Sequence, residues 1–107
     1  MQDRKILFEK QAEIAKALGH PLRVAVLEFL REDEKCVCDI VEFVGSQQSN
    51  VSKHLSLMVG AGILQSRKEG LKVFYKIKTV CVLEFLDCMT QCIKSEIEEQ
   101  NKLLKSL

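Results

Sequence analysis

Residues 47–62, which read QQSNVSKHLSLMVGAG, decide the fold. Val51, Leu55 and Met58 recur three and four positions apart, which is the spacing of one face of an α-helix. We therefore predict a helix that begins near Gln47 and is broken by the two glycines at the end of this stretch.

The residues just before this stretch predict a second, shorter helix. It runs from Cys38 or Asp39 to Val44, and Gly45 is its natural stop. A short helix, a glycine-containing turn and a second helix form a helix-turn-helix. The second helix of such a motif can enter the DNA major groove, which is about 12 Å wide.

Two helices precede this motif. Residues 4–18 carry apolar side chains at helical spacing and are followed by Gly19. Pro21 then suits the first position of a mostly buried helix that ends in the charged residues 31–35. The first half of the chain is therefore predicted to be helical throughout.

A hairpin and one long helix follow the motif. Residues 65–68 and 72–77 flank a Glu-Gly-Leu turn, and the second run alternates apolar and basic residues, so we predict a β-hairpin, or wing. Residues 80–107 again show a helical pattern. Because this last helix is too long for its own chain to cover, we expect a second copy to pack against it.

Length and composition indicate one small domain. The chain has 107 residues, of which 47% are hydrophobic and 29% charged, and its net charge is +1. We therefore expect residues 1–107 to form a single domain, mainly α with a β-hairpin (α+β). The absence of a signal peptide or a long apolar run predicts a cytoplasmic protein without membrane contact. A Gly-rich phosphate loop is absent and there are two histidines, so an enzyme is not expected.

The charges are unevenly distributed. Residues 45–80 contain six Lys or Arg and one acidic residue, whereas residues 28–42 contain two basic and six acidic residues. A localised basic segment is typical of a nucleic-acid-binding surface. The alternative is that these Lys and Arg side chains are ordinary solvent-exposed surface residues, and charge alone does not distinguish the two interpretations.

Four segments together resemble one protein family. They are residues 17–27 (ALGHPLRVAVL), 48–55 (QSNVSKHL), 61–64 (AGIL) and 67–75 (RKEGLKVFY). These segments resemble the ArsR/SmtB family of winged-helix metal-responsive repressors, over roughly residues 12–95. The resemblance implies four helices, two strands and a fifth helix in that order, a homodimer paired through its first and last helices, and binding to double-stranded operator DNA until an effector releases it. At the residue that caps the second helix of the motif, the family usually has Ser or Thr, whereas this chain has Gln47.

The candidate DNA contacts lie on the second motif helix and at the wing tip. Gln and Asn side chains can pair with adenine, Ser can bond base edges, and Lys, Arg or His can contact phosphate. Capping of the helix by Ser49 and Asn50, packing of His54 and a solvated wing are the alternatives. The candidates are Gln48, Ser49, Asn50, Ser52, Lys53, His54, Arg67, Lys68 and Lys72.

The candidate sensor is a cysteine pair in residues 34–40, EKCVCDI. Cys36 and Cys38 can turn both sulfurs to one ion if Cys36 is still extended at the helix start, and soft ions such as As(III) or Sb(III) suit sulfur ligands. The segment resembles the family's Cys-Val-Cys-Asp-Leu arsenite motif. That motif's third cysteine would fall at Val41, so a third sulfur has to come from elsewhere or the site remains two-coordinate.

Three more cysteines fall on one stripe of the last predicted helix. Cys81, Cys88 and Cys92 lie within about 40° of one another around the helix axis. Cys88 and Cys92 are further candidate metal ligands, and small apolar side chains filling a dimer seam are the alternative. The leading prediction is a repressor released by a thiophilic metalloid. The alternative is a redox or reactive-sulfur sensor that uses a dithiol–disulfide switch on the same fold.

Overall fold

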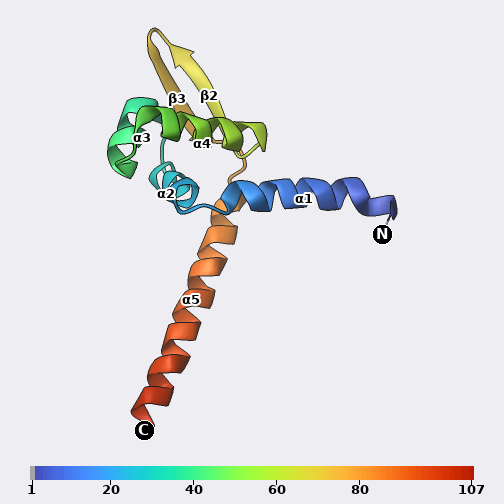
Figure 1. Cartoon of the computed structure of the whole chain (residues 1–107), viewed down its shortest axis with the longest axis vertical. Helices are drawn as coiled ribbons and strands as arrows, with labels where there is room; N and C mark the ends of the chain where they lie inside the picture. The colour runs from blue at the N-terminus through green and yellow to red at the C-terminus, as the bar shows by residue number, and fades with distance from the viewer. Residues whose placement is uncertain (1) are drawn as a thin grey trace.

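The computed structural model describes residues 2–107, and Met1 lies outside the described residues. Its order of helices and strands confirms the winged helix-turn-helix predicted from the sequence (Figure 1). The elements are η1 (Gln2–Arg4), α1 (Lys5–Leu18), α2 (Pro21–Phe29), β1 (Lys35–Cys36), α3 (Val37–Val44), α4 (Gln48–Gly60), β2 (Leu64–Glu69), β3 (Lys72–Ile77) and α5 (Cys81–Lys105).

Helix α3 starts and stops for local reasons. Cys36 has extended backbone angles (φ −75°, ψ 158°), and its Sγ accepts a hydrogen bond from the N–H of Asp39 at 3.3 Å. The helix therefore begins at Val37, one or two residues earlier than predicted. Gly45 ends it in the left-handed region (φ 67°), where a residue without a Cβ is not strained, and its N–H bonds the Val41 carbonyl at 3.0 Å.

Helix α4 ends within the pair of glycines that the sequence predicted would break it. Gly60, which we expected to break the helix, is its last residue. The chain turns at Gly62, whose φ is 80°, and the N–H of Ile63 bonds back to the Met58 carbonyl at 3.0 Å. A glycine stops a helix when the backbone takes a positive φ there, and Gly62 rather than Gly60 does so.

One apolar core joins the helix-turn-helix to α2 and to the base of the wing. Each large side chain in it contributes about 1.5–3 kcal/mol when it is removed from water. The largest fully buried side chains are Leu27, Ile40, Leu55, Met58, Ile63, Leu64, Val26 and Val51.

The wing belongs to a three-stranded sheet in the order β1-β3-β2. Strands β2 and β3 form the predicted antiparallel hairpin, with Arg67 opposite Phe74. The two-residue strand β1 is an addition that the sequence analysis missed. It pairs antiparallel with β3, and Cys36 lies opposite Phe74. The sheet therefore connects the cysteine pair directly to the wing.

Helices α1 and α5 extend away from the core as two arms (Figure 1). Among the described residues, α1 buries Ala17 and Leu18, and α5 buries Val82 and Leu86. The radius of gyration is 17.1 Å, compared with about 13 Å for a compact chain of this length. Arg31 contacts the second turn of α5, because its guanidinium lies 2.8 Å from a carboxylate oxygen of Asp87.

Within the part of the chain that the structure describes, each helix is too short or too polar to span a membrane.

Candidate DNA-binding surface and thiol site

The helix-turn-helix presents the outer face of α4. Val51, Leu55 and Met58 point into the core, so the opposite side of this helix is free to face a partner. Of the predicted contacts on α4, Gln48, Ser49, Asn50 and Lys53 are exposed, and Ser52 is half-buried.

Two predicted DNA contacts on α4 are engaged within the protein. The side-chain amide of Asn50 donates a hydrogen bond to Ser46 Oγ at 2.9 Å, which supports the turn before the helix. His54 is half-buried, and its Nδ1 lies 3.1 Å from Nη1 of Arg23 in α2. The imidazole of His54 therefore faces the body of the protein rather than the exposed side of α4.

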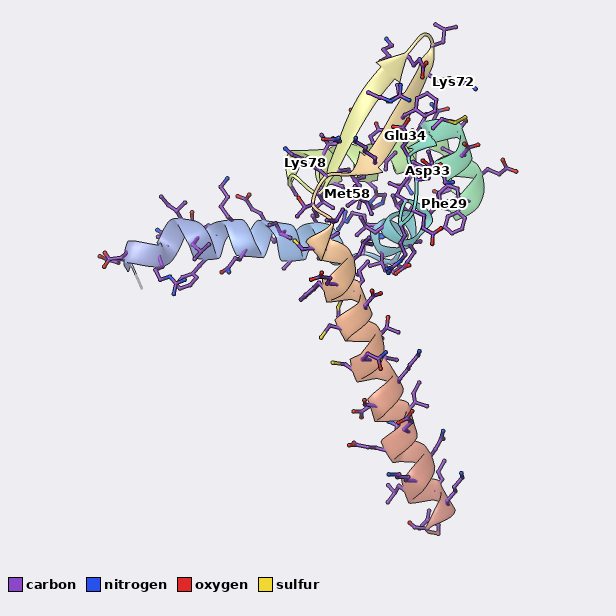
Figure 2. The ribbon with its side chains drawn as sticks, turned by 180° about the vertical axis from the view of Figure 1, so that it is seen from behind. Phe29, Asp33, Glu34, Met58, Lys72 and Lys78 are labelled. Carbon is purple, nitrogen blue, oxygen red and sulfur yellow. A yellow bond between two sulfur atoms is a disulfide. The ribbon has the colours of Figure 1, made fainter. Side chains whose placement is uncertain are left out.

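The three predicted wing contacts differ in their surroundings. Lys72 lies in the part of the hairpin far from α1 and α5 (Figure 2), and both Lys68 and Lys72 are exposed. The register places Lys68 opposite Val73 and Lys72 opposite Glu69, so these two lysines lie on opposite faces of the hairpin. Each face of the wing tip therefore carries one lysine, and Glu69 lies opposite Lys72.

Arg67 is already paired. Its Nε donates to Glu34 at 3.1 Å, a second nitrogen bonds the other oxygen of Glu34, and Nη1 donates to Glu69 at 2.9 Å. The guanidinium also lies 4.6 Å from the ring centroid of Phe74. The bonds from Arg67 lower the pKa of Glu34. A phosphate that contacts Arg67 has to compete with these carboxylates.

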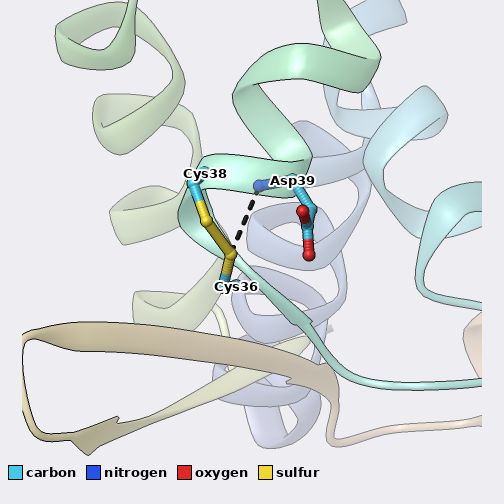
Figure 3. The surroundings of a disulfide bond; sticks show 3 residues. All are labelled: Cys36, Cys38 and Asp39. Atoms are coloured by element: carbon cyan, nitrogen blue, oxygen red, sulfur yellow. Dashed lines mark hydrogen bonds between the residues drawn. A yellow bond between two sulfur atoms is a disulfide. The ribbon is translucent and has the colours of Figure 1, made fainter.

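Cys36 and Cys38 are joined by a disulfide (Figure 3), with their Cα atoms 5.3 Å apart. This differs from the pair of ion-binding thiols in the leading prediction, because the extended Cys36 turns its sulfur toward the first turn of α3. Cys36 is buried and Cys38 is exposed, so the pair is accessible from one side. In this oxidised state neither sulfur can bind an ion, and reduction returns two adjacent thiols.

Residues that could bind an ion gather at this pair. The ligand atoms of Cys36, Cys38 and Asp39 lie within 4.8 Å of one another. Two sulfurs two positions apart in the chain suit a thiophilic ion once they are reduced, whereas the carboxylate of Asp39 is a hard donor. The residues present therefore fit a soft ion held mainly by sulfur.

The cysteines of α5 are separate from this group. Cys81, Cys88 and Cys92 are exposed free thiols, and the cluster of ligand atoms at Cys36 does not include them. Val41, where the resemblance would place a third cysteine, is half-buried.

The connection between the cysteine pair and the wing was not predicted from the sequence. It consists of strand β1, the Glu34–Arg67 ion pair and the stack of Arg67 on Phe74. Two residues are too short a run to show a strand pattern, and Glu34 and Arg67 are 33 positions apart. The opposite charges of the two segments were visible in the sequence, but they do not specify a pair.

Comparison with known proteins gives the family. The family model of bacterial regulatory proteins of the arsR family matches residues 20–66. An HTH-type transcriptional regulator of Methanocaldococcus jannaschii is 44% identical over 71 residues, which are 65% of this chain and 80% of that protein. The cadmium resistance transcriptional regulatory protein CadC of Listeria innocua is 33% identical over 73 residues, or 67% of this chain and 61% of that protein.

A solved structure agrees. The homodimeric winged helix-turn-helix DNA-binding domain of a possible ArsR-family regulator from Mycobacterium bovis superimposes with a TM-score of 0.80. It is 26% identical, and the match covers 91% of each chain. These relatives are regulators with a DNA-binding fold rather than enzymes, as predicted. This chain belongs to the ArsR family of helix-turn-helix transcriptional regulators.

Proposed function

We propose that this protein is a homodimeric repressor that leaves its operator when the reduced thiols of Cys36 and Cys38 bind a thiophilic metalloid such as As(III) or Sb(III). The observation that carries this proposal is the position of the two sulfurs. They meet at the first turn of α3, the helix that leads through Gly45 into α4. The name of the similar cadmium resistance regulator also supports a thiophilic effector.

DNA recognition is assigned to the exposed side of α4 and to the wing tip. Gln48, Ser49, Ser52 and Lys53 supply the hydrogen-bonding groups and the charge that base edges and phosphates require. Asn50 can join them if it releases Ser46. Lys68 and Lys72 would bind phosphate without sequence preference. Arg67 would do the same after breaking its ion pair with Glu34 and forming one with a phosphate.

Dimerisation is assigned to α1 and α5 of the single domain 1–107. Large apolar side chains stand exposed on both arms, among them Ile6 at 74% and Ile93 at 60%. An apolar hollow of about 370 Å³ lies between α1, the end of α4 and the start of α5. Ile14, Leu18 and Phe85 are part of its lining. Exposed apolar surface of this extent is typical of an interface, and the similar M. bovis domain is homodimeric.

The switch would act on both DNA-binding elements. An ion that binds both sulfurs fixes Cys36 against Cys38 and so resets the start of α3. Because Cys36 also pairs with Phe74 in β3, the same movement reaches the wing. Release requires that the ion favour the unbound form by about 1–3 kcal/mol.

The third ligand is a separate question. A third sulfur would have to come from α5, where Cys88 and Cys92 are the candidates, in the same or the second protomer. The near-ultraviolet absorption of the arsenic–thiolate complex measures this: three sulfurs per protomer in the wild type should fall to two in the Cys88→Ser/Cys92→Ser protein. An unchanged count of two in both proteins would leave Cys36 and Cys38 as the whole site.

A dithiol–disulfide switch is the second candidate, because the structure joins these same two sulfurs. In that case an oxidant would remove two electrons and two protons from the pair, and no ion would be needed.

One titration separates these functions. The reduced protein is bound to a duplex that it has selected from a random pool, and arsenite, antimonite, Cd(II), Zn(II) or a mild oxidant is added. We expect arsenite and antimonite to release the wild type and to leave the Cys36→Ser/Cys38→Ser protein bound. Release by the oxidant alone would favour the second candidate, and normal release of the double variant would refute both.

A further inference from the structure

Three helices meet at the side chain of Arg23, near the start of α2. Its Nη2 donates to the carbonyl of Lys16 in the last turn of α1 at 3.2 Å, and its Nη1 lies 3.1 Å from Nδ1 of His54 in α4. The Nε of Arg23 is buried without a partner among the described residues. One guanidinium therefore ties the proposed dimerisation arm α1 to the recognition helix α4.

His20 completes this cluster. Its Nδ1 accepts the N–H of Leu22 at 3.1 Å and caps α2. Its ring lies against that of His54, with centroids 4.4 Å apart and an angle of 48° between the planes. The junction between the arm and the recognition helix is thus made of two imidazoles in tilted contact and one guanidinium.

The contact with Arg23 determines the tautomer and the protonation of the His54 imidazole. A guanidinium offers donors and no acceptor, so Nδ1 of His54 must accept and the ring proton must be on Nε2. Burial lowers the pKa of His54, and the nearby His20 and Arg23 lower it further. Glu13 and Lys16 of α1 line the hollow beside Arg23, and Lys53 is the adjacent charge on α4. A neutral His54 is what this junction requires.

The helix geometry places His54 away from the outer face of α4. Successive residues of a helix are about 100° apart, so Lys53 is turned outward while His54 lies beside the buried Val51 and Met58. A side chain in this position can affect DNA binding by changing the orientation of α4, without contacting the DNA itself.

We infer that Arg23 is a positioning residue for the recognition helix, and that His54 acts by accepting its hydrogen bond at Nδ1 rather than by contacting the operator. This inference rests on the proposed function insofar as α4 reads DNA. It gives the two arms of the dimer a direct connection to the reading helices, because Arg23 bonds both α1 and α4.

Two substitutions of His54 separate positioning from direct contact. The side-chain oxygen of Asn can replace Nδ1 as an acceptor, whereas the longer Gln side chain reaches the position of Nε2. We expect His54→Asn to bind the operator within about twofold of the wild type. His54→Gln and Arg23→Met should each weaken binding roughly tenfold, the effect of losing one hydrogen bond to a charged group. The reverse order for Asn and Gln would overturn the inference.

The pH dependence of operator binding gives a second test, because the two roles of His54 predict opposite changes in affinity at low pH. A positioning His54 loses its bond to Arg23 when it is protonated, so operator affinity should fall as pH drops from 7 to 5, more steeply in the wild type than in His54→Asn. A histidine that contacts phosphate would instead bind more tightly when charged. Because His20 is present in both proteins, the difference between their profiles isolates His54.

A measurement without DNA keeps the inference separate from the proposed function. Long-range ¹H–¹⁵N spectra of the ¹⁵N-labelled protein distinguish the two imidazole tautomers. We expect the Nε2–H form at His54 in the wild type, and a mixture of forms in Arg23→Met, whose thioether offers no N–H donor to Nδ1 of His54. An Nδ1–H form in the wild type would refute the contact even if operator binding were normal. Failure to bind any duplex with the expected tautomer present would refute only the proposed function.

Discussion

Replacing Cys36 by Ser and by Ala separates its role in folding from its role in sensing. In the structure this side chain is 4% exposed and accepts the N–H of Asp39 as the cap of α3. Serine retains an acceptor of similar size and is a favoured capping residue, whereas alanine removes the cap. Both substitutions remove the thiol.

The expected stabilities follow from the cap. Loss of a helix N-cap costs about 1 kcal/mol, which lowers Tm by about 4 °C in a domain of this size. We therefore expect Cys36→Ala to unfold about 4 °C below Cys36→Ser in reducing buffer at matched protein concentration. Cys38→Ser should stay within about 0.5 kcal/mol of the wild type, because Cys38 is exposed.

The expected release is the same for both substitutions. With the wild type, saturating arsenite should weaken operator binding by roughly 5- to 150-fold, as measured by fluorescence anisotropy. Both Cys36 variants should show less than about a twofold change, since one remaining thiol cannot chelate the ion. Release of Cys36→Ser at wild-type arsenite concentrations would refute the sensor assignment. Equal Tm values for the two variants would refute the capping role.

Four further outcomes follow from the structure. Glu34→Gln removes the carboxylate that accepts two of the bonds from Arg67 and leaves Glu69 as its remaining ion pair, so the slope of log K against log salt should steepen by up to about 0.9, and an unchanged slope would place Arg67 outside the interface. Gly45→Ala should cost about 1–2 kcal/mol in denaturant unfolding, because φ is 67° there. Leu55→Ala should cost about 2–5 kcal/mol in the same assay, because the side chain is fully buried. The lowered pKa of His54 means that unfolding binds a proton, so stability should decline as pH falls below about 6.5 and should decline less in His54→Asn.

Local pattern was sufficient to predict the helices and the hairpin. The helix-turn-helix follows from apolar spacing in residues 47–62 and from the stop at Gly45, both of which are short-range properties of the chain. The end of α4 shows the limit of that approach. Two glycines two positions apart look equivalent in the sequence, and only the backbone angle at Gly62 shows which one turns the chain.

Contacts between distant residues account for what the sequence analysis missed. Strand β1 exists because β3 is beside it, and a two-residue segment has no pattern of its own. The bond between Arg23 and His54 joins positions 31 apart, and it turns one predicted DNA contact inward. Helical spacing placed His54 on α4 correctly, but it gave no information on which neighbouring helix would face it.

The placement of Cys36 explains how a small chemical event could control a whole DNA-binding surface. It is the last residue of a two-residue strand and the cap of an eight-residue helix, so it belongs to two elements that are too short to be stable alone. Strand β1 is held by its pairing with β3, and α3 is held by the burial of its own Ile40 in the core. Short elements of this kind have low local stability, and a coupling of about 1–3 kcal/mol is enough to shift them. Because α4 packs on the fully buried core, we expect the start of α3 and the wing to move first and α4 to follow as a rigid helix.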